Sequence, residues 1–143
     1  MPAAFVLQYL LDPLATVVAT AAMRTPFALS AETRLWSLDL DPVYAYPVAV
    51  QVRAGGHRRI ADDLERHEAA WQSYRAAATG LATGLPTPTK MSSRQRLGMV
   101  EDMWEQALAR TIGRTPPRRL SCCLMYALPG CLPCAGCPRT AGA

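Results

Sequence analysis

The sequence has 143 residues, half of them hydrophobic, and a formal net charge of +4. This length suits one domain, and the apolar fraction is too high for an intrinsically disordered chain. Four arginines and no acidic residue follow residue 112, so the excess positive charge lies near the C-terminus. Because four charges are few and no RNA- or DNA-binding motif is present, we do not expect nucleic-acid binding.

Residues 3–23 are strongly apolar. No positively charged stretch precedes them, which argues against a signal peptide. A membrane-spanning helix needs about 20 apolar residues, and Asp12-Pro13 interrupts this segment. We therefore expect two short buried segments, Ala3–Leu11 and Pro13–Met23, the second capped by Asp12. Contact with a membrane is the first alternative, and a cleaved targeting peptide is the second.

Two strands are predicted next, at about residues 34–40 and 47–53. In the second, Val48, Val50 and Val52 occupy alternate positions and so share one face. Two strands alone are only marginally stable. We therefore expect them to pack on helices or to pair with another chain.

The main helix is predicted at about residues 57–79, with Gly80 ending it. Its apolar positions are spaced four, three, four, three and four residues apart, which forms one narrow stripe on a helix. The stripe consists of Ile60, Leu64, His67, Trp71, Tyr74 and Ala78. We expect His67 to be a packed histidine, because no second histidine motif offers it a shared metal.

A second helix is predicted at about residues 93–112. Ser92 and Gln95 match a capping box at its start. Its apolar stripe matches that of the first helix, so the two should form an antiparallel pair around Trp71, Tyr74 and Trp104. The predicted fold is α+β and mostly α, with one small domain over 1–112. Residues 113–143 form an Arg/Pro/Cys-rich tail, for which disorder is one expectation.

All five cysteines lie in that tail: Cys122, Cys123, Cys131, Cys134 and Cys137. An odd number, with none in the body of the chain, argues against a disulfide-stapled secreted fold and favours an intracellular protein. The plainest interpretation is a tail whose cysteines have no dedicated role.

Metal binding is the first alternative for the tail. Cys131-x2-Cys134-x2-Cys137 followed by a proline partly resembles a bacterial ferredoxin cluster run, although the fourth cysteine of that run is missing. Cys122 or Cys123 could supply a fourth ligand to an iron–sulfur cluster or to zinc. S-acylation beside the arginines and thiol redox chemistry are further alternatives.

Gly55, Gly56, Arg58 and Arg59 lie at the expected start of the main helix. Free backbone N–H groups and positive side chains at a helix start can bind an anion. The spacing of a phosphate-binding loop is absent, so a plain strand-to-helix turn is the favoured interpretation.

No arrangement of nucleophile, base and acid is visible in the sequence. Our first hypothesis for function is therefore a non-enzymatic structural or interaction subunit that packs against a protein partner or a second copy. The second hypothesis is a zinc or iron–sulfur protein that uses the tail cysteines. The third is a peripheral membrane protein held by residues 3–23 or by an acylated tail.

Overall fold

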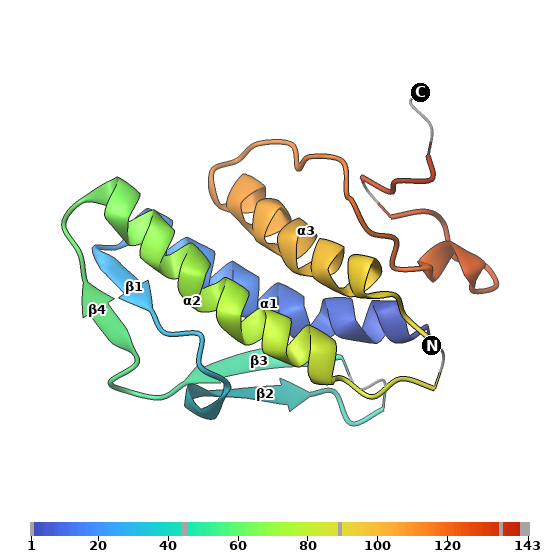
Figure 1. Cartoon of the computed structure of the whole chain (residues 1–143), viewed down its shortest axis with the longest axis horizontal. Coiled ribbons are helices and arrows are strands. Elements are labelled where there is room, and N and C mark those ends of the chain that lie inside the picture. The colour runs from blue at the N-terminus through green and yellow to red at the C-terminus, as the bar shows by residue number, and fades with distance from the viewer. Residues whose placement is uncertain (1, 44–45, 89, 135, 141–143) are drawn as a thin grey trace.

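The structure is a computed structural model that describes residues 2–43, 46–88, 90–134 and 136–140. It is α+β and mostly α, as the sequence predicts. Three helices form the core, and two short antiparallel strand pairs lie at one side (Figure 1). In chain order the elements are α1 (Ala3–Arg24), β1 (Phe27–Leu29), a 3₁₀ turn (Thr33–Leu35), β2 (Trp36–Leu40), β3 (Pro47–Val52), β4 (His57–Arg59), α2 (Asp63–Gly84), α3 (Ser93–Thr111) and a second 3₁₀ turn (Met125–Ala127).

The N-terminal segment is one continuous helix, α1, so the predicted break into two pieces is wrong. Pro13 lies inside the helix and removes only one backbone donor. Asp12 is no N-cap; its carboxylate pairs with Arg110 of α3 at 2.6 Å. The helix tolerates the proline because ten of its side chains are buried, most of them in the core shared with α2 and α3.

By length and hydropathy, α1 could also cross a membrane. In the structure it serves as a core helix that packs against both α2 and α3 (Figure 1). Membrane association of this segment stays a prediction.

The main helix, α2, begins at Asp63 and not at residue 57. The Asp62 carboxylate caps it by accepting a hydrogen bond from the Glu65 N–H at 2.8 Å. The residues expected in its first turns instead form β4. The pattern Asp-x-x-Glu at residues 62–65 is the sequence signal that marks this start.

The predicted stripe of α2 is wrong at its first two members. Ile60 precedes the helix, and Leu64 is 82% exposed. Gly80 does not end the helix, which continues to Gly84. The buried side chains follow each other at every fourth residue: Arg66, Ala70, Tyr74, Ala78 and Ala82.

The antiparallel pairing of α2 and α3 is confirmed by contacts along both helices. The Tyr74 hydroxyl donates to the Val100 carbonyl at 3.0 Å, and the Tyr74 ring stacks on Trp104 with 5.3 Å between centroids. His67 lies nearer the start of α2, and its ring centroid is 5.7 Å from that of Trp104. Ser92 caps α3 as predicted, by accepting from the Gln95 N–H at 3.1 Å.

The described strand residues form two antiparallel pairs that follow one another as a two-stranded ribbon. β2 pairs with β3, and the outer strands β1 and β4 pair with each other. Between the two pairs the ribbon stays connected, because Arg53 N–H donates to the Leu35 carbonyl and Ser30 N–H donates to the Gly56 carbonyl. The sequence predicts the inner pair, but β1 and β4 are too short to show alternation.

Each of the three helices ends in carbonyl groups that accept a hydrogen bond from an arginine of another helix. The last carbonyls of a helix have no partner within it and carry partial negative charge, so a guanidinium suits them. An arginine of α2 donates to a carbonyl at the end of α1, with 2.7 Å between nitrogen and oxygen, and an arginine of α3 donates to the end of α2 at 3.0 Å. An arginine of α1 donates to the end of α3. The pairs are Arg66 with Ala22, Arg96 with Leu85, and Arg24 with Thr111.

We expect Arg66→Met to lower the free energy of unfolding by about 2–3 kcal/mol, because the carbonyls of Ala22 and Ile60 then lose a charged donor. Denaturant unfolding measures this difference. Arg75→Met is the matched control, since Arg75 is exposed on the same helix and lies 3.8 Å from Glu101. The control should cost less than about 1 kcal/mol. Equal losses for the two variants would contradict a buried anchoring role for Arg66.

Candidate metal centre

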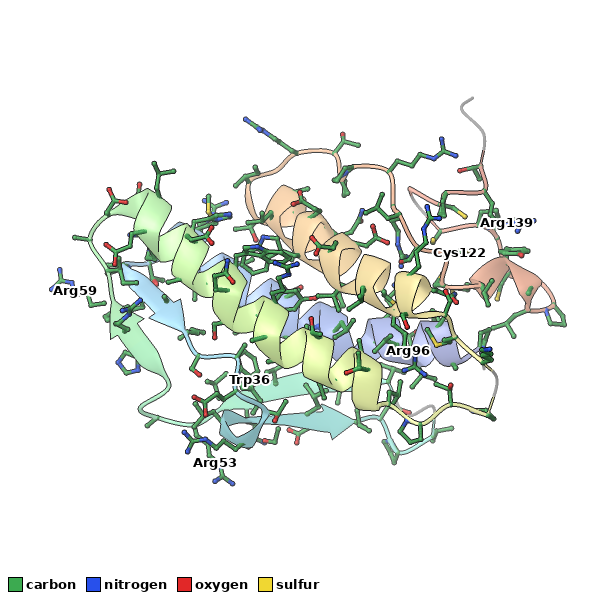
Figure 2. The ribbon with its side chains drawn as sticks, viewed as in Figure 1. Trp36, Arg53, Arg59, Arg96, Cys122 and Arg139 are labelled. Carbon is green, nitrogen blue, oxygen red and sulfur yellow. The ribbon has the colours of Figure 1, made fainter. Side chains whose placement is uncertain are left out.

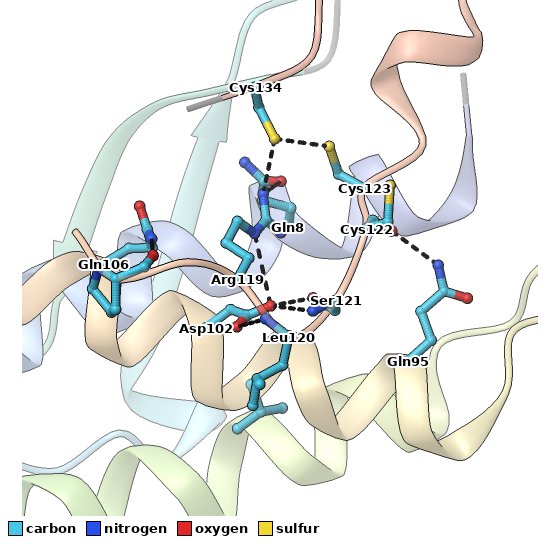
Figure 3. Close-up of polar contacts among 12 residues, drawn as sticks. Gln8, Gln95, Asp102, Gln106, Arg119, Leu120, Ser121, Cys122, Cys123 and Cys134 are labelled. Carbon is cyan, nitrogen blue, oxygen red and sulfur yellow. Dashed lines mark hydrogen bonds and ion pairs between the residues drawn. The ribbon is translucent and has the colours of Figure 1, made fainter. Parts of the chain in front are cut away.

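The tail runs back along α3 in the opposite direction and is held there by side chains of that helix (Figure 3). Gln106 donates to the Pro117 carbonyl at 3.0 Å, and Gln95 donates to the Cys122 carbonyl at 3.0 Å. Between these two contacts lies Asp102. The tail therefore follows the helix over most of the helix length, although it has little regular structure of its own.

Asp102 is the central anchor of this contact. Its carboxylate accepts from the N–H of Leu120 at 2.6 Å, from the N–H of Ser121 at 2.7 Å and from the Ser121 hydroxyl. The Asp102 side chain is only 4% exposed. A buried carboxylate with three donors is well compensated, and removing it would leave those donors unpaired.

Four of the five sulfurs gather beyond this anchor. The sulfurs of Cys123 and Cys134 are 3.7 Å apart, and neither residue is in a disulfide. The neighbouring thiols of Cys122 and Cys134 contribute to lowering the pKa of Cys137. In a tetrahedral zinc site with bonds of about 2.3 Å, the sulfurs lie about 3.8 Å apart. The spacing of the Cys123–Cys134 pair therefore already fits two ligands of one metal.

Backbone N–H groups favour the thiolate form of two of these cysteines. The N–H of Leu124 donates to the sulfur of Cys122 at 3.4 Å. The backbone N–H groups of Arg139 and Thr140 lower the pKa of Cys137, and the Thr140 N–H donates to the Cys137 carbonyl at 3.3 Å. Such donors stabilise a thiolate more than a thiol. The turns that follow Cys122 and Cys137 are thus arranged to hold negative sulfur.

The thiols differ in their acidity for physical reasons. The pKa of Cys137 is lowered, first by the backbone N–H of Arg139 and then by that of Thr140 and by neighbouring thiols, against the effect of burial. Burial raises the pKa of Cys134 to about 11, and Cys123 adds to the increase. Without a metal, the site therefore holds at least one neutral thiol at neutral pH, and a metal ion must displace its proton.

A tight turn places Cys134 and Cys137 together. The Cys137 N–H donates to the Cys134 carbonyl at 3.0 Å, and Gly136 between them has a φ of +71°. A Cβ at Gly136 would lie 3.3 Å from the Pro117 carbonyl oxygen, so glycine suits both the conformation and the close approach. The Gly136 carbonyl accepts from the Arg119 N–H at 3.0 Å, which joins this turn to the part of the tail beside Asp102.

Arg119 lies between the sulfurs and the helices (Figure 3). One guanidinium nitrogen, Nη1, donates to Gln8 of α1 at 2.9 Å and to the sulfur of Cys134 at 3.6 Å. Its Nε lies 3.7 Å from a carboxylate oxygen of Asp102. Arg119 is 5% exposed, and its Nε and Nη2 have no hydrogen-bond partner among the described residues.

Within the described part of the chain, no three His, Cys, Asp or Glu side chains already stand as a finished metal site. Among the described residues one pair of sulfurs is in contact, that of Cys123 and Cys134, so the other two sulfurs would have to move closer for all four to meet one ion. The arrangement differs from a catalytic zinc site, which keeps a position open for water. Four thiolates would fill a tetrahedral site completely.

The structure sorts the predicted cysteines into two groups. It brings together Cys122, Cys123, Cys134 and Cys137. Cys131 makes no sulfur contact with them among the described residues, so the structure does not place the three cysteines of the ferredoxin-like run together. Its N–H only closes a turn to the Leu128 carbonyl at 3.1 Å.

The predicted anion site at Gly55, Gly56, Arg58 and Arg59 assumes that these residues begin a helix, and in the structure they do not. The glycines lie in the turn before β4 and the arginines in β4, whereas the helix begins later. The first N–H groups of α2 are therefore not beside these residues, and Asp62 caps them instead.

Three residues of the site were missed from sequence: Gln8, Asp102 and Arg119. Asp102 lies outside the apolar stripe predicted for its helix, so no local pattern predicts that it is buried. Its burial depends on a tail that returns from 18 residues further along the chain. The only available signal was the cluster of arginines at residues 114–119 in a tail without acids.

Comparisons of the chain with protein families, with curated proteins and with solved structures find no match.

We expect Asp102→Asn to release the tail from α3, because an amide can neither accept as strongly nor present two equivalent oxygens to the three donors. The amide hydrogens of Leu120 and Ser121 should exchange at least about tenfold faster, since a hydrogen bond to a charged group contributes about 1.5–3 kcal/mol. Hydrogen–deuterium exchange with mass spectrometry measures this. Glu105→Gln, on the exposed face of α3, is the control and should leave the tail protected.

Proposed function

We propose that this chain is a non-enzymatic metal-binding protein whose tail cysteines hold one zinc ion in a structural site. The ligands are Cys122, Cys123, Cys134 and Cys137. The observation that supports the proposal is the 3.7 Å contact between the sulfurs of Cys123 and Cys134, which are 11 residues apart in sequence. Cys122 adjoins the first of these residues, and Cys137 is near enough to both Cys122 and Cys134 for their thiols to lower its pKa. Two adjacent ligands and a Cys-x2-Cys pair together supply the four thiolates of a closed zinc site.

A single zinc ion fits the ligand set better than an iron–sulfur cluster. A cluster run would use Cys131, Cys134 and Cys137 together, but the sulfur of Cys131 is not with the others. Zinc has no preferred geometry from its d electrons and accepts a tetrahedron of four sulfurs. S-acylation would need free thiols and is therefore an alternative to metal binding at the same residues.

The metal would stabilise a part of the chain that has little apolar core of its own. Between the helical end at Thr111 and residue 140, the described residues form only one short 3₁₀ turn. A metal that joins the two turns closes the intervening loop in the folded state and adds its binding free energy to folding. The role is structural, because four protein ligands leave no open coordination position for a substrate.

We expect the reduced chain to bind one zinc or cobalt ion, and Cys134→Ser to weaken that binding at least about a hundredfold, because a closed site loses one of its four ligands. Cobalt titration, followed by the thiolate-to-cobalt charge-transfer absorption, gives the stoichiometry, and competition by zinc gives the affinity.

Cys131→Ser is the matched control for this titration. It removes the same group from the same tail, yet its sulfur lies outside the cluster, so its affinity should equal that of the unsubstituted chain. A chain that binds no metal would disprove the proposed function. A loss of affinity in Cys131→Ser as large as in Cys134→Ser would disprove the choice of ligands.

A second candidate function is an interaction subunit, supported by the β2–β3 hairpin. Strands β2 and β3 pair only with each other among the described residues, so each has an unpaired edge. Large apolar side chains are exposed on this hairpin, with Val43 at 76% and Val48 at 57%. Exposed apolar side chains beside a free edge are typical of a surface that pairs with another chain. We take a second copy of this chain as the partner.

For this candidate we expect the chain to sediment as a dimer at micromolar concentration, and Val48→Lys to shift it to the monomer, because a charge at the strand surface opposes edge pairing. Analytical ultracentrifugation measures both. Thr83→Lys, an exposed position on α2, is the control and should leave the dimer intact. A chain that is monomeric at every concentration tested would rule out self-association.

A further inference from the structure

We propose that Arg119 is the counter-cation of the metal centre and raises its affinity for a divalent ion. Arg119 would be a positioning residue that acts through charge and does not itself bind the metal. The inference rests on the proposed zinc site, and it assigns a function to a buried arginine that the fold alone leaves incompletely paired.

The first observation is the state of the guanidinium. Arg119 is almost completely buried, yet its Nε and Nη2 lack hydrogen-bond partners among the described residues. A buried cation with unpaired donors is strongly unfavourable unless a negative group lies close to it. The buried arginine on α2, Arg66, shows the ordinary case: its three nitrogens all donate to carbonyl or carboxylate oxygens.

Asp102 compensates Arg119 only in part. The nearest approach, 3.7 Å from Nε to a carboxylate oxygen, is an ion pair without a hydrogen bond. The carboxylate oxygens are already engaged by the donors of Leu120 and Ser121. Asp102 thus serves mainly as the anchor of the tail, and the guanidinium keeps unused donors.

The second observation is the direction in which Arg119 faces the sulfurs. Its Nη1 is 3.6 Å from the sulfur of Cys134, which is in turn 3.7 Å from the sulfur of Cys123 (Figure 3). A neutral thiol is a weak acceptor, whereas a thiolate is a strong one that pairs well with a guanidinium. The arginine is therefore better matched to the thiolate form of the cluster than to the thiol form.

The charges of the two states show why this favours metal binding. Four thiols without metal carry no charge, and then Arg119 has only Asp102 as a counter-ion. Four thiolates around a divalent ion carry a net charge of −2. A nearby cation stabilises that centre and contributes nothing comparable to the neutral thiols, so the difference raises the metal affinity.

The location of Arg119 also joins the centre to the helices. The same guanidinium donates to Gln8 near the start of α1 and faces Asp102 on α3. Arg53, Arg59 and Arg139 lie at the surface of the molecule, as Figure 2 shows, and the other buried arginine, Arg66, lies on α2. Arg119 is the buried one beside the sulfurs, so the proposed role follows from its position and not from the general abundance of arginine.

The test compares neutral and charged replacements of Arg119 in the full, reduced chain. Arg119→Met and Arg119→Gln remove the charge, and each should weaken zinc binding at least tenfold in a chelator competition. Arg119→Lys keeps the charge and should stay within threefold of the unsubstituted chain. Two neutral variants are used so that a folding failure of one, seen by circular dichroism, leaves the other. Arg114→Met, an exposed arginine of the same tail, should bind zinc normally.

Each outcome decides the inference. Neutral variants that bind zinc as tightly as the unsubstituted chain would overturn it, and so would an Arg119→Lys variant as weak as Arg119→Met, because shape and not charge would then matter. Both results would leave the zinc site itself intact. Absence of zinc binding in the unsubstituted chain would overturn the proposed function and this inference together.

Discussion

The three helices are tied at their ends by arginines that bind carbonyl groups of the neighbouring helix. The core between them is rich in alanine, which lets the helix axes approach closely but buries little apolar surface per residue. Polar bonds at the ends therefore carry much of the specificity of the arrangement. A guanidinium suits this role better than an ammonium, since its planar donors can reach several carbonyls at once, as Arg96 does with Ala82 and Leu85.

The sequence predicts those elements whose signals are local. Ser92 with Gln95 marks the start of α3, and the alternation of valines marks β3; both are present. The errors arise where distant contacts override a local rule. Pro13 suggests a break, yet packing on two other helices keeps α1 whole. Gly80 suggests a stop, yet the helix continues, because a glycine inside a helix costs only about 1 kcal/mol relative to alanine.

The sequence predicts the chemistry of the candidate site but not which cysteines form it. The cysteines and their concentration in the tail are plain in the sequence, and spacing alone favours the Cys131, Cys134 and Cys137 triplet. The path of the backbone favours another set, because a turn at Gly136 and an anchor at Asp102 bring the earlier cysteine pair to the later one. No local pattern encodes such an anchor, since its partners are far away in the chain.

The tail therefore depends on two kinds of interaction that support each other. Asp102 holds one point of the tail on α3, but a single buried carboxylate does not determine the path of the residues beyond it. The sulfur cluster joins those later residues to the anchored part, and Arg119 touches both the cluster and the helices. A metal ion that completes the cluster would add its binding free energy to the docking of the tail, and docking would in turn arrange the ligands for the metal. Reciprocity of this kind is required by thermodynamic linkage.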